Sequence, residues 1–266
     1  MRVGVLPFAL GAKFPDLVQS WRTAEEAGFS ALWTVDHATP TRDLGPAWEG
    51  SSLLVAMAGC TRNIPVGVLV FDVLLRHPFI VAGSVAVAQA LSGGRVRVGL
   101  GVGDKFSKVD HDALGLAFPP IADRVRFLEA CCTALPSLWR GDTVTDPLLG
   151  LKEAALGSID IEPPPLIIGG GSQDLMELGA RHAQGWNLFT QEPETFEASV
   201  EVLKSVEAAT GRNKPLERSV YLFVERTSGD LRGLLKDFEA AGAEEAMLVV
   251  MKPNRDSILS LASQVL

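Results

Sequence analysis

The chain is poor in cysteine and has no excess of basic residues. It contains 3 cysteines in 266 residues, too few for a disulfide scaffold, and Cys131 and Cys132 are adjacent and poorly placed to bridge each other. We therefore expect reduced thiols, as in a cytoplasmic protein. Lys and Arg number 24 against 32 Asp and Glu, giving a net charge of −8. This balance argues against general binding to nucleic acid or to an anionic membrane surface.

The chain also lacks an apolar run long enough to span a bilayer. The longest run, residues 79–91, is shorter than a spanning helix and contains Ser84 and Gln89. The first residues carry one basic side chain and are interrupted by Pro7 and Gly11, so we interpret them as a strand and not as a signal peptide. The sequence therefore predicts a soluble, cytoplasmic protein with no membrane partner.

Short apolar runs rich in Val, Ile and Leu recur along the whole sequence. Most are continuously apolar, which is typical of strands buried on both faces of a parallel sheet, and helical spacing fills most intervals between them. Eight such strands with intervening helices predict a (β/α)8 TIM barrel, forming a single domain over residues 1–266. The competing architecture, an open doubly wound sheet, usually has a glycine-rich turn after its first strand, which is missing here. The predicted strands are 2–6, 31–35, 65–71, 95–100, 166–168, 186–189, 220–224 and 246–251.

Three glycines, Gly28, Gly185 and Gly242, lie between a predicted helix and the next predicted strand. We expect each to adopt the left-handed conformation that glycine takes at no steric cost just after a helix. The interval between the fourth and fifth strands is too long for one helix. We predict a helix over 121–139, flanked by irregular stretches at 102–120 and 140–164. Since insertions in βα loops lie on the catalytic face of a barrel, residues 102–120 are predicted to form one wall of a site.

Asp36 and His37 directly follow the second predicted strand. Catalytic groups of barrel enzymes project from such carboxyl ends of strands. Histidine exchanges a proton near neutral pH, and an adjacent carboxylate supports its charge. We therefore predict a catalytic role for His37 and Asp36, against the alternative of a loop histidine bonded to backbone.

Two glycine-rich segments follow predicted strands. Gly169, Gly170, Gly171 and Ser172 precede a predicted helix over 173–183. Glycines allow a close backbone approach, and the free N–H groups of a helix start are suited to a phosphate. The sequence therefore predicts an anion cradle at these four residues, with a flexible turn as the alternative.

The second segment contains Gly101, Gly103 and Asp104 after the fourth predicted strand. Its glycines suit either a flat ligand against the backbone or a strand thinned for packing, and we keep both alternatives. Asp104 would then be an available carboxylate, and we count it as a candidate catalytic residue with His37 and Asp36. Neither glycine segment has the spacing of a Walker A or a dinucleotide-binding motif.

Asp110, His111 and Asp112 form a group that invites a metal interpretation. No further ligand recurs at a suitable spacing, and no H-E-x-x-H motif occurs. We interpret the group as a solvated loop and predict no metal site.

In their order and spacing, these features resemble the bacterial luciferase-like family of flavin- and deazaflavin-dependent barrel enzymes. The likeness covers roughly residues 1–190. The segments that carry it are AEEAGFSALWTVDH (24–37), the stretch 60–67, Arg76-His77-Pro78, ALSGGRVRVGLGVGD (90–104), the residues from Arg124 to 142, and PPLIIGGGS (164–172).

The resemblance implies a cofactor ring in the carboxyl-end mouth of the barrel. In the family's F420-dependent members an Asp-His pair lies beside the deazaflavin, which implies cofactor contact for Asp36 and His37. A non-proline cis peptide behind the ring maps to Leu69-Val70, and the phosphate-binding turn maps to residues 169–172. Asp104 stands where the family's sugar-phosphate dehydrogenases have Glu, and is one methylene shorter.

The function implied by the resemblance is that of an F420-dependent oxidoreductase that transfers a hydride between the deazaflavin and a small organic substrate. No second basic cluster is available for a sugar phosphate, so a neutral or hydrophobic substrate is expected. The alternatives are an FMN-dependent two-component monooxygenase, a non-catalytic flavin- or deazaflavin-binding relative, and a phosphate-binding barrel unrelated to flavins. An F420 reductase or flavin reductase is the expected cofactor supplier, and a homodimer is the expected assembly.

Overall fold

The computed structural model describes residues 1–40, 45–159, 161–227 and 229–266. Eight parallel strands close into a barrel in the order β1-β10-β9-β8-β7-β4-β3-β2. The predicted (β/α)8 TIM barrel is therefore confirmed, and each predicted strand is present. The barrel strands are β1 (Arg2–Pro7), β2 (Leu32–Thr34), β3 (Val66–Asp72), β4 (Val96–Gly101), β7 (Leu166–Gly169), β8 (Gly185–Phe189), β9 (Glu217–Phe223) and β10 (Glu245–Val250).

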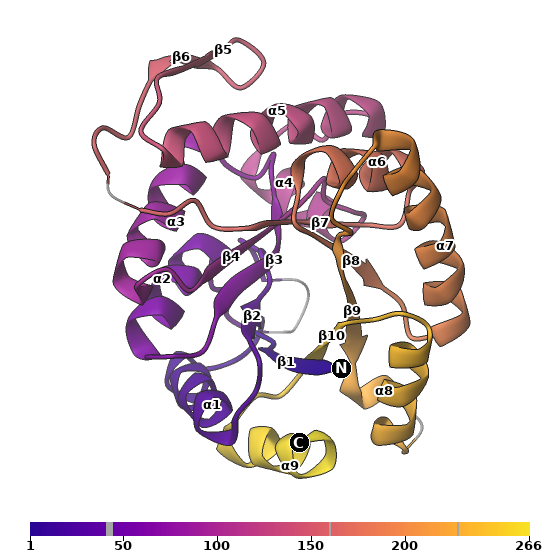
Figure 1. Ribbon diagram of the computed structural model, residues 1–266. Helices are drawn as coiled ribbons and strands as arrows, with labels where there is room; N and C mark the ends of the chain where they lie inside the picture. Colours follow the sequence, from indigo (N-terminus) through magenta and orange to yellow (C-terminus); the bar gives the residue numbers. More distant parts are fainter. Residues whose placement is uncertain (41–44, 160, 228) are drawn as a thin grey trace.

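Helices form a ring around these strands (Figure 1). No helix in the described ranges is both long enough and apolar enough to cross a membrane. The helices are α1 (Phe14–Ala27), α2 (Gly50–Cys60), α3 (Pro78–Ser92), α4 (Ser107–Leu114), α5 (Ile121–Trp139), α6 (Gln173–His182), α7 (Pro193–Thr210), α8 (Leu231–Ala240) and α9 (Arg255–Val265), with a 3-10 turn η1 (Val224–Arg226).

Glycines end two of the helices as the sequence predicts. Gly28 and Gly242 have φ angles of 91° and 99°, in the left-handed region. The prediction for Gly185 is wrong, because α6 already ends at His182 and Gly185 is the first residue of β8. A Cβ on Gly185 would lie 3.1 Å from the side chain of Ile167, so close strand packing favours glycine there.

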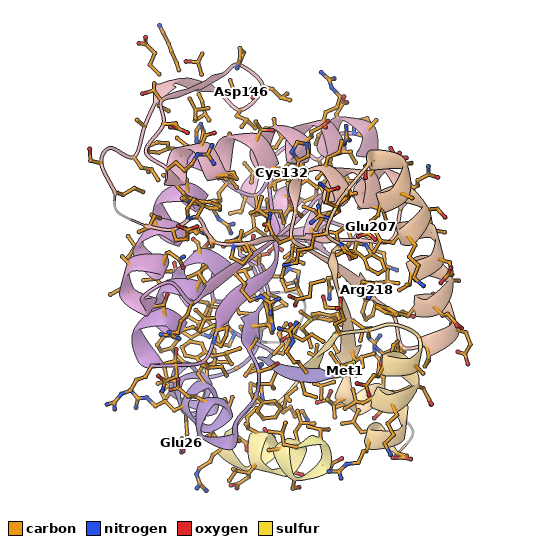
Figure 2. The ribbon with its side chains drawn as sticks, viewed as in Figure 1. Met1, Glu26, Cys132, Asp146, Glu207 and Arg218 are labelled. Atoms are coloured by element: carbon orange, nitrogen blue, oxygen red, sulfur yellow. The ribbon has the colours of Figure 1, made fainter. Side chains whose placement is uncertain are left out.

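The long interval between β4 and β7 contains more regular structure than predicted. The helix over 121–139 is confirmed as α5. The irregular stretches are wrong in part, because residues 102–120 contain α4 and residues 140–164 contain an antiparallel hairpin of β5 (Val144–Asp146) and β6 (Leu151–Ala154). These elements are too short to produce a clear hydrophobic period. The hairpin projects outward beyond α5 (Figure 1), and Asp146, labelled in Figure 2, lies on it.

Two apolar clusters make up the core. The larger lies between the strands and the helices, and a smaller one joins alternate strand residues such as Leu6, Trp33 and Met247, which face the interior of the barrel. The interior cluster reaches the carboxyl ends of the strands, because its member Val35 directly follows β2 and its member Val249 is the penultimate residue of β10.

At the opposite end of the barrel, a buried ion pair closes the interior. Arg97 Nη1 lies 2.7 Å from Glu245 Oε2, and the guanidinium also pairs with Glu217 and stacks over the Trp33 ring at 5.1 Å. Glu245 is fully buried and also accepts a hydrogen bond from Ser30 Oγ at 2.9 Å. A buried carboxylate needs such a partner, because desolvation without compensation is costly.

Replacement of Glu245 by Gln leaves Arg97 buried with one fewer counter-charge. We expect the free energy of unfolding to fall by about 3 kcal/mol, measured by urea denaturation. As a control, Glu201→Gln removes one partner of the exposed Lys204 pair and should change the unfolding free energy by less than about 1 kcal/mol. Equal losses in the two variants would contradict this account of the barrel floor.

Candidate active site

The predicted site residues gather at the carboxyl ends of the strands. Asp36 and His37 follow β2, Gly103 and Asp104 follow β4, and the glycine turn follows β7. In a parallel barrel these ends share one rim, which is where barrel enzymes build their sites. The rim therefore brings together the segments that the sequence singled out.

Asp36 is buried and held by an arginine. Its two carboxylate oxygens lie 2.8 Å and 2.5 Å from the guanidinium nitrogens of Arg76, and one also accepts the Asp72 N–H at 3.1 Å. Burial raises the pKa of the Asp36 carboxyl, and Arg76 and the Asp72 N–H oppose that rise. The paired geometry favours the carboxylate form and holds Asp36 in place below His37.

Arg76 also contacts a second carboxylate, from the start of α2. Its Nη2 lies 2.7 Å from Glu49 Oε1. Burial alone would lower the pKa of the Arg76 guanidinium, but the hydrogen bond and charge of Asp36, and the charge of Glu49, raise it. Arg76 therefore links the ends of β2 and β3 to α2 as a permanently charged residue.

His37 is bound by a carboxylate from the insertion. Its Nδ1 lies 2.8 Å from Asp110 Oδ2, and its side chain retains 18% exposure. Burial by itself lowers the pKa of His37, but the hydrogen bond and charge of Asp110, with the charges of Asp36 and Asp104, raise it. His37 is thus a partly exposed histidine whose charged form is stabilised at the rim.

The interpretation of residues 110–112 as a solvated loop is wrong. Asp110 and His111 lie on α4 and are fully buried, whereas Asp112 is exposed and pairs with Lys108. His111 Nε2 lies 2.8 Å from Asp72 Oδ2. Consecutive residues of α4 therefore reach the ends of β2 and β3. The sequence signal was an Asp-His pair in the segment predicted to wall the site, but its partners lie 39 and 73 residues away.

Val70 explains why glycines occupy β4 and the end of β7. The Leu69-Val70 peptide bond is cis, which confirms the position implied by the resemblance. A Cβ on Gly101 would clash with the Val70 side chain, and one on Gly169 would lie 2.7 Å from it. Packing against Val70 is thus sufficient reason for glycine at these two positions, and contact of Leu69, Val70 and Gly101 with a cofactor stays a prediction.

Gly103 and Asp104 shape the start of the insertion. Gly103 has φ of 68°, and a Cβ there would lie 2.5 Å from Asp72 Oδ2. Asp104 is exposed, and its Oδ1 accepts the N–H groups of Phe106 and Ser107 at 2.8 Å and 3.0 Å, which starts α4. Arg124, from α5, holds the Gly103 carbonyl at 2.8 Å. The catalytic role predicted for Asp104 is untested by this arrangement.

The turn after β7 presents backbone at the start of α6. Gly170 has φ of 128°, and a Cβ on Gly171 would lie 2.8 Å from Leu188. Ser172 precedes the helix, and its side chain makes no capping hydrogen bond. The exposed N–H groups of the first turn are therefore free of a side-chain cap, as an anion cradle requires.

Sequence reasoning missed an aromatic cluster at the carboxyl ends of β1, β8 and β9. Phe223 lies 6.5 Å from Phe8 and 5.7 Å from Phe189, centroid to centroid, and Tyr221 lies 5.6 Å from Phe223. Phe189 is 53% exposed. The available signal was an aromatic residue at or just after the end of each of these strands.

Among the residues described, no group of three or more side chains is suited to a metal ion.

The closed parallel barrel and the Asp-His pair after its second strand place this chain among the α/β-barrel proteins with a site at the carboxyl ends of the strands. Residues 2–250 match the family described as luciferase-like monooxygenase, and the chain belongs to that family.

Curated relatives match part of the chain. F420-dependent glucose-6-phosphate dehydrogenase from Beutenbergia cavernae is 31% identical over 181 residues, which cover 64% of this chain and 51% of that protein. F420-dependent hydroxymycolic acid dehydrogenase from Mycobacterium tuberculosis is 29% identical over 178 residues, covering 64% and 48%. The matched region thus spans about half the length of these relatives.

Solved structures match the whole barrel. An F420-dependent secondary alcohol dehydrogenase, in complex with an F420-acetone adduct, has a TM-score of 0.84 at 16% identity and covers 100% of this chain and 98% of its own. The F420-dependent tetrahydromethanopterin reductase from Methanopyrus kandleri has a TM-score of 0.78 at 16% identity, covering 100% and 99%. A monooxygenase from Streptomyces bottropensis has a TM-score of 0.73 at 17% identity, covering 99% and 98%. At these identities the likeness shows a shared fold.

Replacement of Gly101 by Ala tests the packing of β4 against Val70. The added methyl group has no space, so we expect the free energy of unfolding to fall by about 1–3 kcal/mol. Gly179→Ala is the control, because its Cβ would lie 3.6 Å from its nearest neighbours, within a helix. That variant should be more stable by about 0.5–1 kcal/mol. Thermal denaturation measures both, and a neutral Gly101→Ala would contradict the packing described.

Proposed function

We propose that this chain is an F420-dependent oxidoreductase that transfers a hydride between the deazaflavin and a small organic substrate. The observation that carries the proposal is the partly exposed His37, held by buried carboxylates at the rim of the barrel. Two relatives of the same family are named F420-dependent dehydrogenases. Neither the site around His37 nor the names of these relatives identify the particular substrate of this chain.

The residues at the rim fit such a cofactor. The N–H groups of Gly171 and of the uncapped start of α6 would hold a phosphate, with Gly170 shaping the turn while its own N–H is donated to the Asn187 carbonyl at 3.0 Å, and Leu69 and Val70 would lie behind the ring. When bound, the deazaflavin supplies a carbon that accepts or donates hydride without activating oxygen. The chain has a net charge of −8, so the local backbone dipoles of this turn, and not the overall field, would attract the anion.

The chain's own chemical task is then to orient the reactants and to manage one proton. His37 is the proposed donor or acceptor, because its Nδ1 is bound to Asp110 and its Nε2 has no hydrogen bond within the described part of the chain. Asp104 is the second candidate, because its Oδ2 accepts no hydrogen bond from any described residue. Asp36 would act indirectly, with Arg76, by fixing the end of β2.

The substrate class that suits this rim is neutral or apolar. Phe8, Phe189 and Phe223 form an aromatic surface at the carboxyl ends of β1, β8 and β9. Arg76, which contacts Asp36, is already paired with Asp36 and Glu49. We propose that the segments 102–120 and 189–195 help to shape the pocket. The segment 38–52 is a further candidate for shaping the pocket, and its residues 41–44 lie outside the described residues.

A cofactor-binding experiment tests the proposal. The purified protein is titrated with F420 and with FMN, and quenching of cofactor fluorescence is measured. We expect binding of F420 at least tenfold tighter than that of FMN. Tight FMN binding without F420 binding would contradict the proposal and favour the monooxygenase alternative, in which a flavin reductase supplies the reduced cofactor.

His37→Ala separates catalysis from cofactor storage. Loss of a general acid or base lowers turnover by about 10²–10⁴-fold, whereas the affinity for F420 should change little because the proposed phosphate contacts come from a different segment, the turn after β7. Turnover is followed by F420 absorbance in a panel of alcohols and carbonyl compounds. If the wild-type chain binds F420 but reduces or oxidises nothing in the panel, the non-catalytic alternative is favoured.

We also propose that the chain forms a homodimer through an apolar surface on α3, defined by Ile80, Gly83, Val87 and Leu91. Ile80, Val87 and Leu91 are 51–56% exposed and recur with helical spacing. Neither α2 nor α3, which pack together, contains a charged residue. Because each chain carries a net charge of −8, this uncharged surface is where two copies can approach with least repulsion. A twofold axis would place it against itself.

Val87→Asp should disrupt this dimer, since it places a buried like-charge pair near the twofold axis. Size-exclusion chromatography with light scattering should show a dimer of 28.4 kDa chains for the wild type and a monomer for the variant. Val202→Asp, at a 44% exposed valine on α7, is the matched control and should leave the dimer intact. A monomeric wild type, or equal effects of the two substitutions, would contradict this assembly.

A further inference from the structure

We infer that Asp110 is a positioning residue for His37, which it fixes with the proton on Nδ1 and with Nε2 directed to the reactants. This inference deepens the proposed function and rests on it for the identity of the reaction. The pair itself is a property of the chain without cofactor, so it can be tested separately.

The surroundings of Asp110 fix its role as an acceptor. Its Oδ1 accepts three hydrogen bonds, from Ala38 N at 3.1 Å, Thr39 N at 2.7 Å and Thr39 Oγ1 at 2.6 Å. Such bonds stabilise an ionised carboxylate, which has no proton to donate. Its Oδ2, 2.8 Å from His37 Nδ1, must therefore accept, and Nδ1 must carry the hydrogen. The other ring nitrogen is then the one that can exchange a proton with a ligand.

A second Asp-His pair anchors the helix that carries Asp110. His111, the next residue of α4, lies 2.8 Å from Asp72 Oδ2 through Nε2, and its Nδ1 donates a hydrogen bond to the Ala117 carbonyl at 2.9 Å. Both His111 and Asp72 are buried. This pair ties α4 to β3, whereas the Asp110 pair ties it to the segment after β2. Asp72 therefore anchors α4 without contacting His37, whereas Asp110 both anchors α4 and contacts His37, so a comparison of the two separates the effects.

Three carboxylates face His37. Asp110 approaches from α4, Asp36 is its neighbour in the chain, and Asp104 lies in the segment before α4. Asp36 is already paired with Arg76, and Asp104 is exposed to solvent. Asp110 makes the direct hydrogen bond and is fully buried, so its charge is screened least. Loss of this charge should change His37 more than loss of any other nearby group.

The test compares Asp110→Asn with Asp72→Asn in the cofactor-free protein. Each substitution replaces the carboxylate of one Asp-His pair that joins α4 to a strand end, but only Asp110 contacts His37. The chain has 4 histidines, so their ring signals can be assigned and titrated by NMR. We expect the pKa of His37 to fall by about one unit or more in Asp110→Asn, and by much less in Asp72→Asn. Turnover with F420 should fall by about 10–100-fold in Asp110→Asn, with the pH-rate limb due to His37 moved to lower pH.

An unchanged His37 pKa in Asp110→Asn would overturn the inference. An equal fall in both variants would also overturn it, because Asp110 would then act only by anchoring α4. Should a variant fail to fold, the ¹⁵N shifts of His37 in the wild-type chain above its pKa report the tautomer directly. The Nδ1–H form is expected, and the Nε2–H form would overturn the inference. Absence of F420 turnover in the wild type would count against the proposed function and leave these NMR results standing.

Discussion

The contact between Asp110 and His37 is the interaction on which the rest of the site depends. It crosses 73 positions of sequence and joins the end of β2 to a short helix in the insertion. A partly exposed histidine at a barrel rim would otherwise titrate near its ordinary range. Here the hydrogen bond to the buried Asp110 sets the orientation of the ring, and although burial lowers the pKa of His37, that bond and the nearby carboxylate charges raise it and favour the charged form. The insertion therefore contacts His37 directly and is not only a wall beside the rim.

The two sides of the rim carry different kinds of side chain. The side of β2, β3 and α4 carries interlocked ion pairs, with Arg76 between Asp36 and Glu49 and His111 on Asp72. The side of β8 and β9 carries aromatic rings, and the turn after β7 presents bare backbone. The rim thus has a charged side and an apolar side, and under the proposed function the first would manage a proton and the second would contact an uncharged reactant. Such an arrangement fits a cofactor that itself carries the hydride.

Much of this architecture could be predicted from local patterns. Continuous apolar runs located every barrel strand, and Gly28 and Gly242 located helix ends, because these signals depend on neighbouring residues. The position of Asp36 and His37 followed from the end of a strand. The partners of these residues could not be predicted, because Asp110 contacts His37, and His111 contacts Asp72, only after the barrel has closed. Gly185 shows the same limit, since its small size serves packing against Ile167 and not a helix end.

The central claim is that this rim holds F420 with its ring beside His37. A crystal structure of the chain in complex with F420 tests it most directly. We predict the cofactor phosphate at the N–H groups of residues 171–173, the deazaflavin against Leu69 and Val70, and His37 Nε2 facing the reactive side of the ring. A ring bound away from the carboxyl ends of the strands, or a phosphate bound outside the turn after β7, would contradict the claim.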